Sequence, residues 1–152
     1  MTPGIAQFMR ELERMWDGHR DALLTQRDLA AAVEPLAPGA SVQHLPAGTG
    51  AVGRPAVQRF YAEEFLPYLP GDLGLARISR TVDRFRLVDE LTVSFTHDRE
   101  LPWLLPGVPP THQRAEVLAI AVVSFERGQI RGQRILWDYA TLTAQLGAPG
   151  PG

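Results

Sequence analysis

The sequence predicts an α+β domain in which helices cover one face of a curved antiparallel sheet. Two observations predict this class. Three segments with helical spacing of apolar residues lie in the first half of the chain, and alternating or continuous apolar runs fill the second half. The 152 residues suit one domain, which we expect to span residues 1–147. The Pro/Gly-rich tail at 148–152 is expected to be disordered.

Composition excludes several kinds of function. Hydrophobic residues make up 45% of the chain and charged residues 21%, which is enough for a sizeable core. A net charge of −2 without a dense basic cluster argues against a nucleic-acid partner. The absence of cysteine excludes disulfides and thiol chemistry, and the absence of lysine excludes a Schiff base. No segment resembles a signal peptide or a membrane span, so we expect a cytoplasmic protein that binds no membrane.

Three helices are predicted before the sheet. The first, at 4–17, has an apolar face made of Ile5, Phe8, Met9, Leu12, Met15 and Trp16. We interpret this face as core or as a dimer contact, and Gly18 is the expected end of the helix. An alanine-rich second helix is expected at 27–36, and a third at 54–69 with Tyr61 on its buried face.

The predicted strands begin with a short one at 41–45, which a glycine-rich turn follows. An irregular strand is expected at 78–88, with Arg80 solvated and with Asp89–Glu90 as the hairpin turn. The next strand alternates apolar and polar residues with a period of two. One of its faces carries Leu91, Val93, Phe95 and His97, and this face is expected to line a pocket.

A proline-rich segment and two more strands complete the sheet. Residues 103–110, WLLPGVPP, are too apolar and too stiff for a free loop, so we expect a pocket lid. The nearly continuous apolar run at 116–125 predicts a central strand covered on both faces. Its apolar residues 117–123 would expose apolar surface on the outer face of the sheet, and burial of that surface predicts a homodimer. The last strand is expected at 130–137.

Asp138 follows the last strand, between Trp137 and Tyr139, and has two interpretations. It can cap a short following helix, because Asp is a preferred N-cap residue. Held instead in an apolar pocket, its carboxyl would have a raised pKa and would transfer protons near neutral pH. Arg134 shares its strand face and could bind a ligand oxygen, or pair with Asp138 and lower its pKa.

Three motifs stand at strand ends and in the loop between them. They are Phe95-Thr96-His97, the LPGVPPT run at 105–111, and Leu136-Trp137-Asp138. With Gln145-Leu146-Gly147 they resemble the SnoaL-like branch of the nuclear-transport-factor-2-like superfamily, in particular a subgroup often labelled as related to dienelactone hydrolase. The resemblance covers roughly residues 5–147.

The resemblance implies a cone-shaped, bent antiparallel sheet wrapped by N-terminal helices around a pocket, the cystatin-like α+β barrel. It implies Asp138 as general acid/base, and we expect His97 to assist it as a proton shuttle or an orienting partner. Gln133 and Arg134 depart from the pattern, because relatives commonly carry Glu and His there. The expected substrate contacts are Arg134, Trp103, Trp137, Tyr61, His44 and Phe95.

The function implied is a cofactor-free acid/base enzyme, a cyclase, isomerase or dehydratase. Its substrate would be a small hydrophobic oxygenated intermediate of polyketide or terpenoid type. No metal is expected, because the four histidines are scattered without ligand spacing. Two alternatives stay open: an epoxide hydrolase of the same fold, and a ligand-binding module without turnover. Convergence of Asp138 and His97 inside an apolar pocket would favour an enzyme.

Overall fold

The computed structural model describes residues 4–148, so the expected tail falls outside the described residues except for Ala148. The helices are α1 (Ile5–Asp21), α2 (Leu29–Val33), α3 (Arg54–Phe60) and α4 (Tyr139–Leu146). A wide turn at Ala22–Gln26 extends α1, and turns at Tyr61–Phe65 and Leu66–Tyr68 extend α3. The strands are β1 (Leu36–Leu45), β2 (Thr49–Val52), β3 (Gly74–Val82), β4 (Arg86–Thr96), β5 (Arg114–Glu126) and β6 (Gln129–Trp137).

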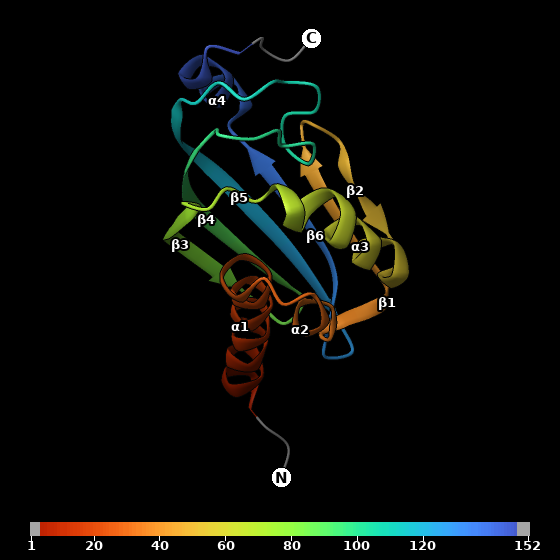
Figure 1. The fold of residues 1–152 in the computed structure, drawn as a ribbon. Helices are drawn as coiled ribbons and strands as arrows, with labels where there is room; N and C mark the ends of the chain where they lie inside the picture. The colour runs from red at the N-terminus through yellow and green to blue at the C-terminus, as the bar shows by residue number, and fades with distance from the viewer. Residues whose placement is uncertain (1–3, 149–152) are drawn as a thin grey trace.

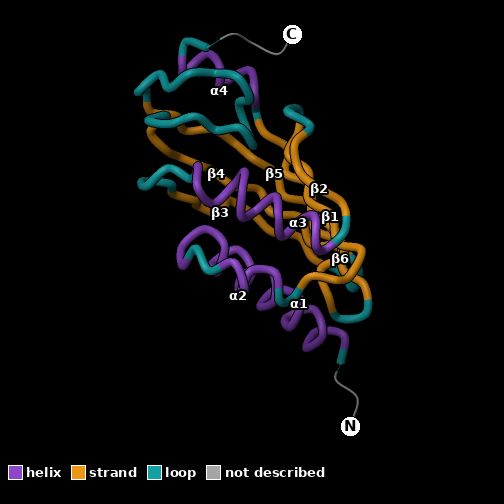
Figure 2. The backbone as a smooth tube through the Cα atoms, turned by 45° about the vertical axis from the view of Figure 1, so that its right-hand side comes forward, coloured by secondary structure: helices purple, strands orange, loops and turns teal. Residues whose placement is uncertain are grey.

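The strands form one six-stranded sheet in the order β2-β1-β6-β5-β4-β3. Helices α1, α2 and α3 cover the same face of this sheet, and α4 lies at its end (Figures 1 and 2). The predicted α+β class, with a bent sheet and N-terminal helices, is therefore confirmed. One pairing differs from the prediction, because β1 runs parallel to β6 while all other neighbours are antiparallel. No hairpin joins these two strands, so no turn dictates their relative direction.

The first helix continues past Gly18, where the sequence predicted its end. A glycine inside a helix costs only about 1 kcal/mol relative to alanine. The added turns bury His19 and Leu23 on the face that already holds Leu12 and Trp16, and this burial outweighs the cost. The second helix is shorter than predicted.

The prediction of Asp89–Glu90 as a turn was wrong. The turn lies at 83–85, where Asp83 Oδ1 accepts hydrogen bonds from the backbone of Phe85 and Arg86. Asp89 stands inside β4, opposite Arg80 of β3, and is fully buried. Arg80 was expected to be solvated, yet only 7% of its side chain is exposed. A buried carboxylate needs a partner, and this cross-strand arginine supplies it.

Strand β5 is not covered on both faces. Its residues alternate, so that Ala119 and Ala121 are buried while Leu118 and Ile120 are 45% and 41% exposed. The buried side faces the helices and forms the core. The exposed side leaves an apolar outer face on the sheet.

The first part of the segment expected to be a lid is packed rather than free, whereas most of residues 106–110 are exposed. Trp103, Leu104 and Leu105 are at most 2% exposed, and the turn that carries them is closed by backbone bonds to Leu101. The Thr49 hydroxyl also donates to the Trp103 carbonyl, which ties the segment to β2. This burial agrees with the apolar composition of the segment.

Candidate functional site

A cavity lies between the concave face of the sheet and the helices. Aliphatic side chains, three tryptophans and Phe65 make up most of its lining. The lining also contains five polar residues, His19, Arg20, His44, Tyr61 and Gln133, and among the described residues no Asp or Glu belongs to it. Its volume is about 70 Å³. That holds a few water molecules and is under half of the roughly 150 Å³ cavity known to bind benzene. The cavity is partly open, so a ligand of that size extends beyond this volume or displaces a side chain of the wall.

His19 projects from α1 into the cavity wall and is 2% exposed. Its Nδ1 lies 2.7 Å from the carbonyl oxygen of Ala32. Because a carbonyl oxygen only accepts hydrogen bonds, Nδ1 carries the proton and Nε2 presents a lone pair. Burial lowers the pKa of His19 to about 4, so the ring is neutral near pH 7.

Tyr61 and Gln133 gather at the same nitrogen of His19. The Gln133 side-chain amide donates to His19 Nε2 at 3.1 Å and to the Tyr61 hydroxyl at 3.1 Å. The Tyr61 hydroxyl itself lies 3.5 Å from His19 Nε2. Burial raises the pKa of Tyr61, so its hydroxyl stays protonated. The cluster places one base and one O–H donor side by side.

His44, on β1, is enclosed by aromatic rings. The centroids of Phe60, Phe65, Trp103 and Trp137 lie between 5.3 and 6.3 Å from that of His44. Trp137 Nε1 donates to His44 Nδ1 at 3.2 Å. Burial lowers the pKa of His44 to about 4, so this ring is also neutral.

A buried ionic network stands behind one wall of the cavity. Arg80 donates to both carboxylate oxygens of Asp89, at 2.7 and 2.9 Å, and to Asp17 at 2.6 Å. Asp89 also accepts from Trp16 Nε1 at 3.1 Å and from Arg20 at 3.4 Å. Trp16 and Arg20 line the cavity, so the network fixes the wall that α1 contributes.

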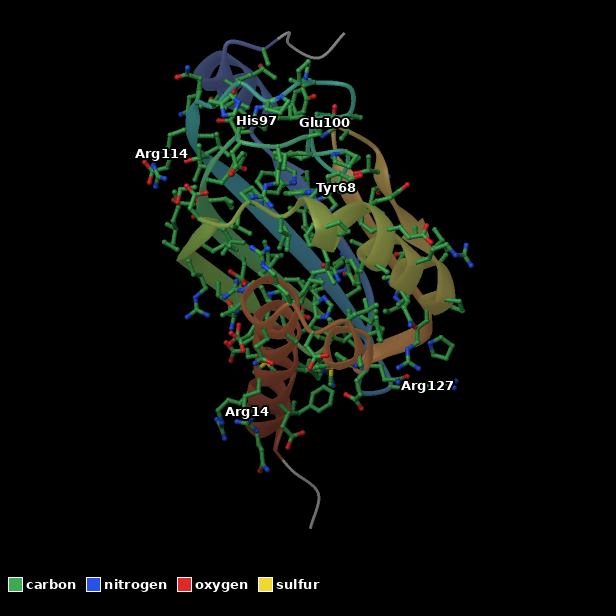
Figure 3. All side chains as sticks on the ribbon, in the orientation of Figure 1. Arg14, Tyr68, His97, Glu100, Arg114 and Arg127 are labelled. Carbon is green, nitrogen blue, oxygen red and sulfur yellow. The ribbon has the colours of Figure 1, made fainter. Side chains whose placement is uncertain are left out.

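The structure shows no hydrogen bond between Asp138 and His97. Asp138 is exposed and caps α4, where its carboxylate accepts from the backbone of Thr141 at 3.3 Å. His97 is fully buried, with Nδ1 3.0 Å from the Thr111 hydroxyl. Figure 3 shows His97 near α4, at the opposite end of the molecule from Arg14 of α1. Neither residue lines the cavity, so this geometry gives no support to a catalytic pair.

The six expected substrate contacts divide into two groups. Those that line the cavity are Trp103, Trp137, Tyr61 and His44. Phe95 is fully buried in the core but does not reach the cavity, and Arg134 is exposed on the outer sheet face. Arg134 points outward because its neighbour Gln133 points inward and strand side chains alternate.

Sequence reasoning missed His19, Gln133 and Asp89 as site residues. His19 follows Trp16 by three positions and Leu12 by seven, so the helical period alone places it on the buried face. Gln133 lies two residues before Ile135 and four before Trp137, so the period of two in β6 places it on the same face as these apolar residues. No pattern of neighbouring residues predicts the burial of Asp89, because its environment depends on its pairing with Arg80 of another strand.

The bent six-stranded sheet, with helices on one face and a cavity between the two, is the nuclear-transport-factor-2-like fold. The model of the SnoaL-like polyketide cyclase family matches residues 14–146, and the chain belongs to that family. No curated protein sequence matches it. No helix within residues 4–148 is long and apolar enough to cross a membrane.

Solved structures show the same fold. A putative SnoaL-like polyketide cyclase from Jannaschia sp. CCS1 superposes with a TM-score of 0.73 at 21% identity, over 98% of this chain and 97% of that chain. AclR, a putative hydroxylase from Streptomyces galilaeus, gives 0.67 at 19% identity, over 95% and 98%. The epoxide hydrolase/cyclase-like enzyme SalBIII gives 0.62 at 15% identity, over 87% and 93%.

Replacement of Asp138 separates its two interpretations. As an N-cap, Asp138→Ala is expected to lower the free energy of unfolding by about 0.5–2 kcal/mol, and Asp138→Asn to change it little, because asparagine caps as well as aspartate. Guanidinium denaturation measures both. A folded Asp138→Asn protein without activity would restore the catalytic interpretation.

The two neutral histidines predict acid destabilisation. His19 and His44 each have a pKa near 4 in the folded protein, against 6.5 for the free side chain. The unfolded chain therefore binds more protons between these values, and stability is full above pH 6.5 and falls towards pH 4. The shift corresponds to at most about 3 kcal/mol for each histidine.

Denaturation curves between pH 7.5 and pH 4.5 measure this loss. A His19→Gln variant is expected to show a shallower decline, while His112→Gln, in an exposed loop position, keeps the original slope. Equal slopes for all three proteins would show that His19 is not held neutral by the fold.

Proposed function

We propose that the protein is a cofactor-free acid/base enzyme that moves protons on a small hydrophobic oxygenated molecule, as a cyclase, isomerase or dehydratase. The observation that carries this proposal is the lone pair of His19 Nε2, which stands beside the Tyr61 O–H in an apolar cavity. Membership in the SnoaL-like polyketide cyclase family supports a polyketide-like substrate.

The proposed reaction begins when His19 Nε2 takes a proton from a carbon next to a carbonyl group. The C–H electron pair moves into the carbonyl, whose oxygen gains negative charge. The Tyr61 hydroxyl donates a hydrogen bond to this oxygen, as an oxyanion-stabilising group does. When a C=C bond is conjugated with the enolate, return of the proton from His19 to the far carbon of that bond isomerises the substrate. Attack of the enolate carbon on a second carbonyl instead closes a ring, and the new alkoxide oxygen takes the proton from His19.

Gln133 prepares both groups for this step. Its amide donates to His19 Nε2 and to the Tyr61 oxygen, which holds the two atoms in place while the cavity is empty of ligand. Donation to the Tyr61 oxygen also lowers the pKa of the phenol, against the larger effect of burial. A substrate replaces the contact between Gln133 and His19 and keeps the one to Tyr61.

Deuterium exchange tests this proposal without knowledge of the natural product. The protein is incubated in D₂O with a panel of aryl ketones and β-diketones, and NMR follows the loss of the proton signal next to the carbonyl. We expect exchange well above the buffer rate for at least one member. Tight binding of panel members without any exchange would instead favour a ligand-binding module.

The outer sheet face supports the homodimer that the sequence predicted. Val88, Leu118, Ile120 and Leu136 are 36–45% exposed there, and Ile120 pairs directly with Leu136. Such a contiguous apolar face favours association. Ile120→Glu is expected to shift the mass measured by light scattering from dimer to monomer, whereas Phe85→Glu, 63% exposed in the turn before β4, leaves it unchanged. A monomeric wild-type protein would contradict the proposal.

A further inference from the structure

His44 is the second buried imidazole of the cavity, and its tautomer is fixed by a neighbour. Trp137 Nε1 lies 3.2 Å from His44 Nδ1. An indole N–H can only donate, so Nδ1 of His44 accepts. In a neutral ring the proton then resides on Nε2. His19 has the opposite tautomer, because the carbonyl of Ala32 requires a proton on its Nδ1.

The Nε2–H of His44 opens onto the cavity. It has no hydrogen-bond partner among the described residues. Within these residues, His97 Nε2 is the one side-chain nitrogen or oxygen that is both fully enclosed and unpaired. His44 Nε2 therefore borders open space, and since His44 lines the cavity and is only 5% exposed, that space is the cavity.

We infer that His44 is a substrate-contacting residue whose neutral Nε2–H binds a carbonyl or hydroxyl oxygen of the ligand, and that Trp137 is the positioning residue that fixes this donor. The inference rests on the proposed function and adds to it a second polar contact. A neutral imidazole N–H is an established electrophile towards carbonyl oxygen. Burial, which lowers the pKa of His44, keeps the ring in the form that this role requires.

The two histidines thus define a ligand class. The cavity offers a proton acceptor at His19 and a proton donor at His44, separated by apolar and aromatic wall. A fitting ligand is an uncharged aromatic or alicyclic molecule with at least two oxygens, one bound at Tyr61 and one at His44. A free carboxylate is disfavoured at His44, because an ion among the aromatic rings around this residue loses its hydration.

The chain offers a matched control for Trp137. Trp103 also lines the cavity, and its ring centroid lies 5.3 Å from that of His44. Its Nε1, however, is 3.5 Å from the carbonyl oxygen of Tyr68 and not bonded to His44. Trp137→Phe and Trp103→Phe therefore remove similar aromatic area, but only the first removes the bond that fixes the tautomer.

Long-range ¹H–¹⁵N spectra of the histidine rings test the tautomer directly. In the wild-type protein and in Trp103→Phe we expect His44 to be protonated on Nε2 only. In Trp137→Phe we expect both tautomers. A proton on Nδ1 of His44 in the wild-type protein, or no difference between the two variants, would overturn the inference.

A matched pair of ligands tests the contact itself. Acetophenone and α-methylstyrene have the same shape, but the second carries a CH₂ group in place of the carbonyl oxygen. We expect the wild-type protein to bind acetophenone about 3- to 10-fold more tightly than α-methylstyrene, as one added hydrogen bond allows. His44→Phe is expected to weaken this preference, because only the Tyr61 hydroxyl is then left to bind the carbonyl oxygen, and an unchanged preference would overturn the inference.

Failure of the inference on His44 can be distinguished from failure of the proposed function. Deuterium exchange that depends on His19, together with an Nδ1-protonated His44, would refute the role of His44 and leave the proposed function in place. Absence of exchange, together with the predicted tautomer and ligand preference, would refute the proposed function and leave the role of His44.

Discussion

A His19→Gln protein is expected to fold and to lose about 10²–10⁴-fold of its exchange activity. Glutamine keeps a similar length and can bond to the carbonyl of Ala32, but it offers no basic nitrogen at the position of Nε2. The loss is expected in kcat, because proton abstraction occurs after binding. Initial exchange rates at several ketone concentrations measure the effect.

Two controls accompany this variant. His112→Gln makes the same chemical change at an exposed loop residue and is expected to keep full activity. Circular dichroism and thermal unfolding show whether His19→Gln remains folded. A folded His19→Gln protein with wild-type rates would remove His19 from the mechanism.

The second large effect concerns the ionic network behind the cavity. Arg80→Met is expected to lower the free energy of unfolding by about 3–5 kcal/mol, because it leaves the fully buried carboxylate of Asp89 without its main partner. Arg77→Met, at an exposed residue of the same strand, is expected to cost less than about 0.5 kcal/mol.

A double variant tests whether the unpaired charge of Asp89 causes the loss of stability in Arg80→Met. Asp89→Asn removes the charge while an amide oxygen still accepts from Trp16. Arg80→Met with Asp89→Asn is therefore expected to be more stable than Arg80→Met alone. Urea denaturation measures each protein. A loss below about 1 kcal/mol for Arg80→Met would show that the network contributes little to stability.

Much of the fold follows from short-range patterns. The alternation at 91–97 placed Leu91, Val93 and Phe95 on the buried face of β4, as the structure shows. The third helix and the packed segment around Trp103 also followed from local apolar spacing and composition. Such features depend on neighbours a few residues apart, so a single sequence contains them.

The cavity was harder to predict, because it depends on contacts between distant segments. Trp103, Trp137, Tyr61 and His44 were expected in the site, and all four line the cavity. The ionic network needs the register between β3 and β4. The turn at 83–85 sets that register and was not recognised, so Asp89 was assigned to the hairpin turn.

The sequence also could not decide whether Asp138 is an N-cap or a general acid/base. Both interpretations put an aspartate at the end of the last strand. They differ only in the direction of one side chain after the strand, which the first turn of α4 determines. For His19 the limit was different, since the period of the helix pointed to it but Gly18 was given too much weight as a helix end.

The pH dependence of kcat/KM for deuterium exchange between pH 8 and pH 5 shows whether a buried, neutral His19 is the base. This parameter reports the ionisation of the free enzyme. A buried His19 with a pKa near 4 predicts a nearly constant value across this range, and a value about 10²–10⁴-fold lower in His19→Gln. A base with the ordinary histidine pKa of about 6.5 would instead be about 30-fold less active at pH 5 than at pH 8. That decline, or a wild-type profile in His19→Gln, would show that a buried, neutral His19 is not the base.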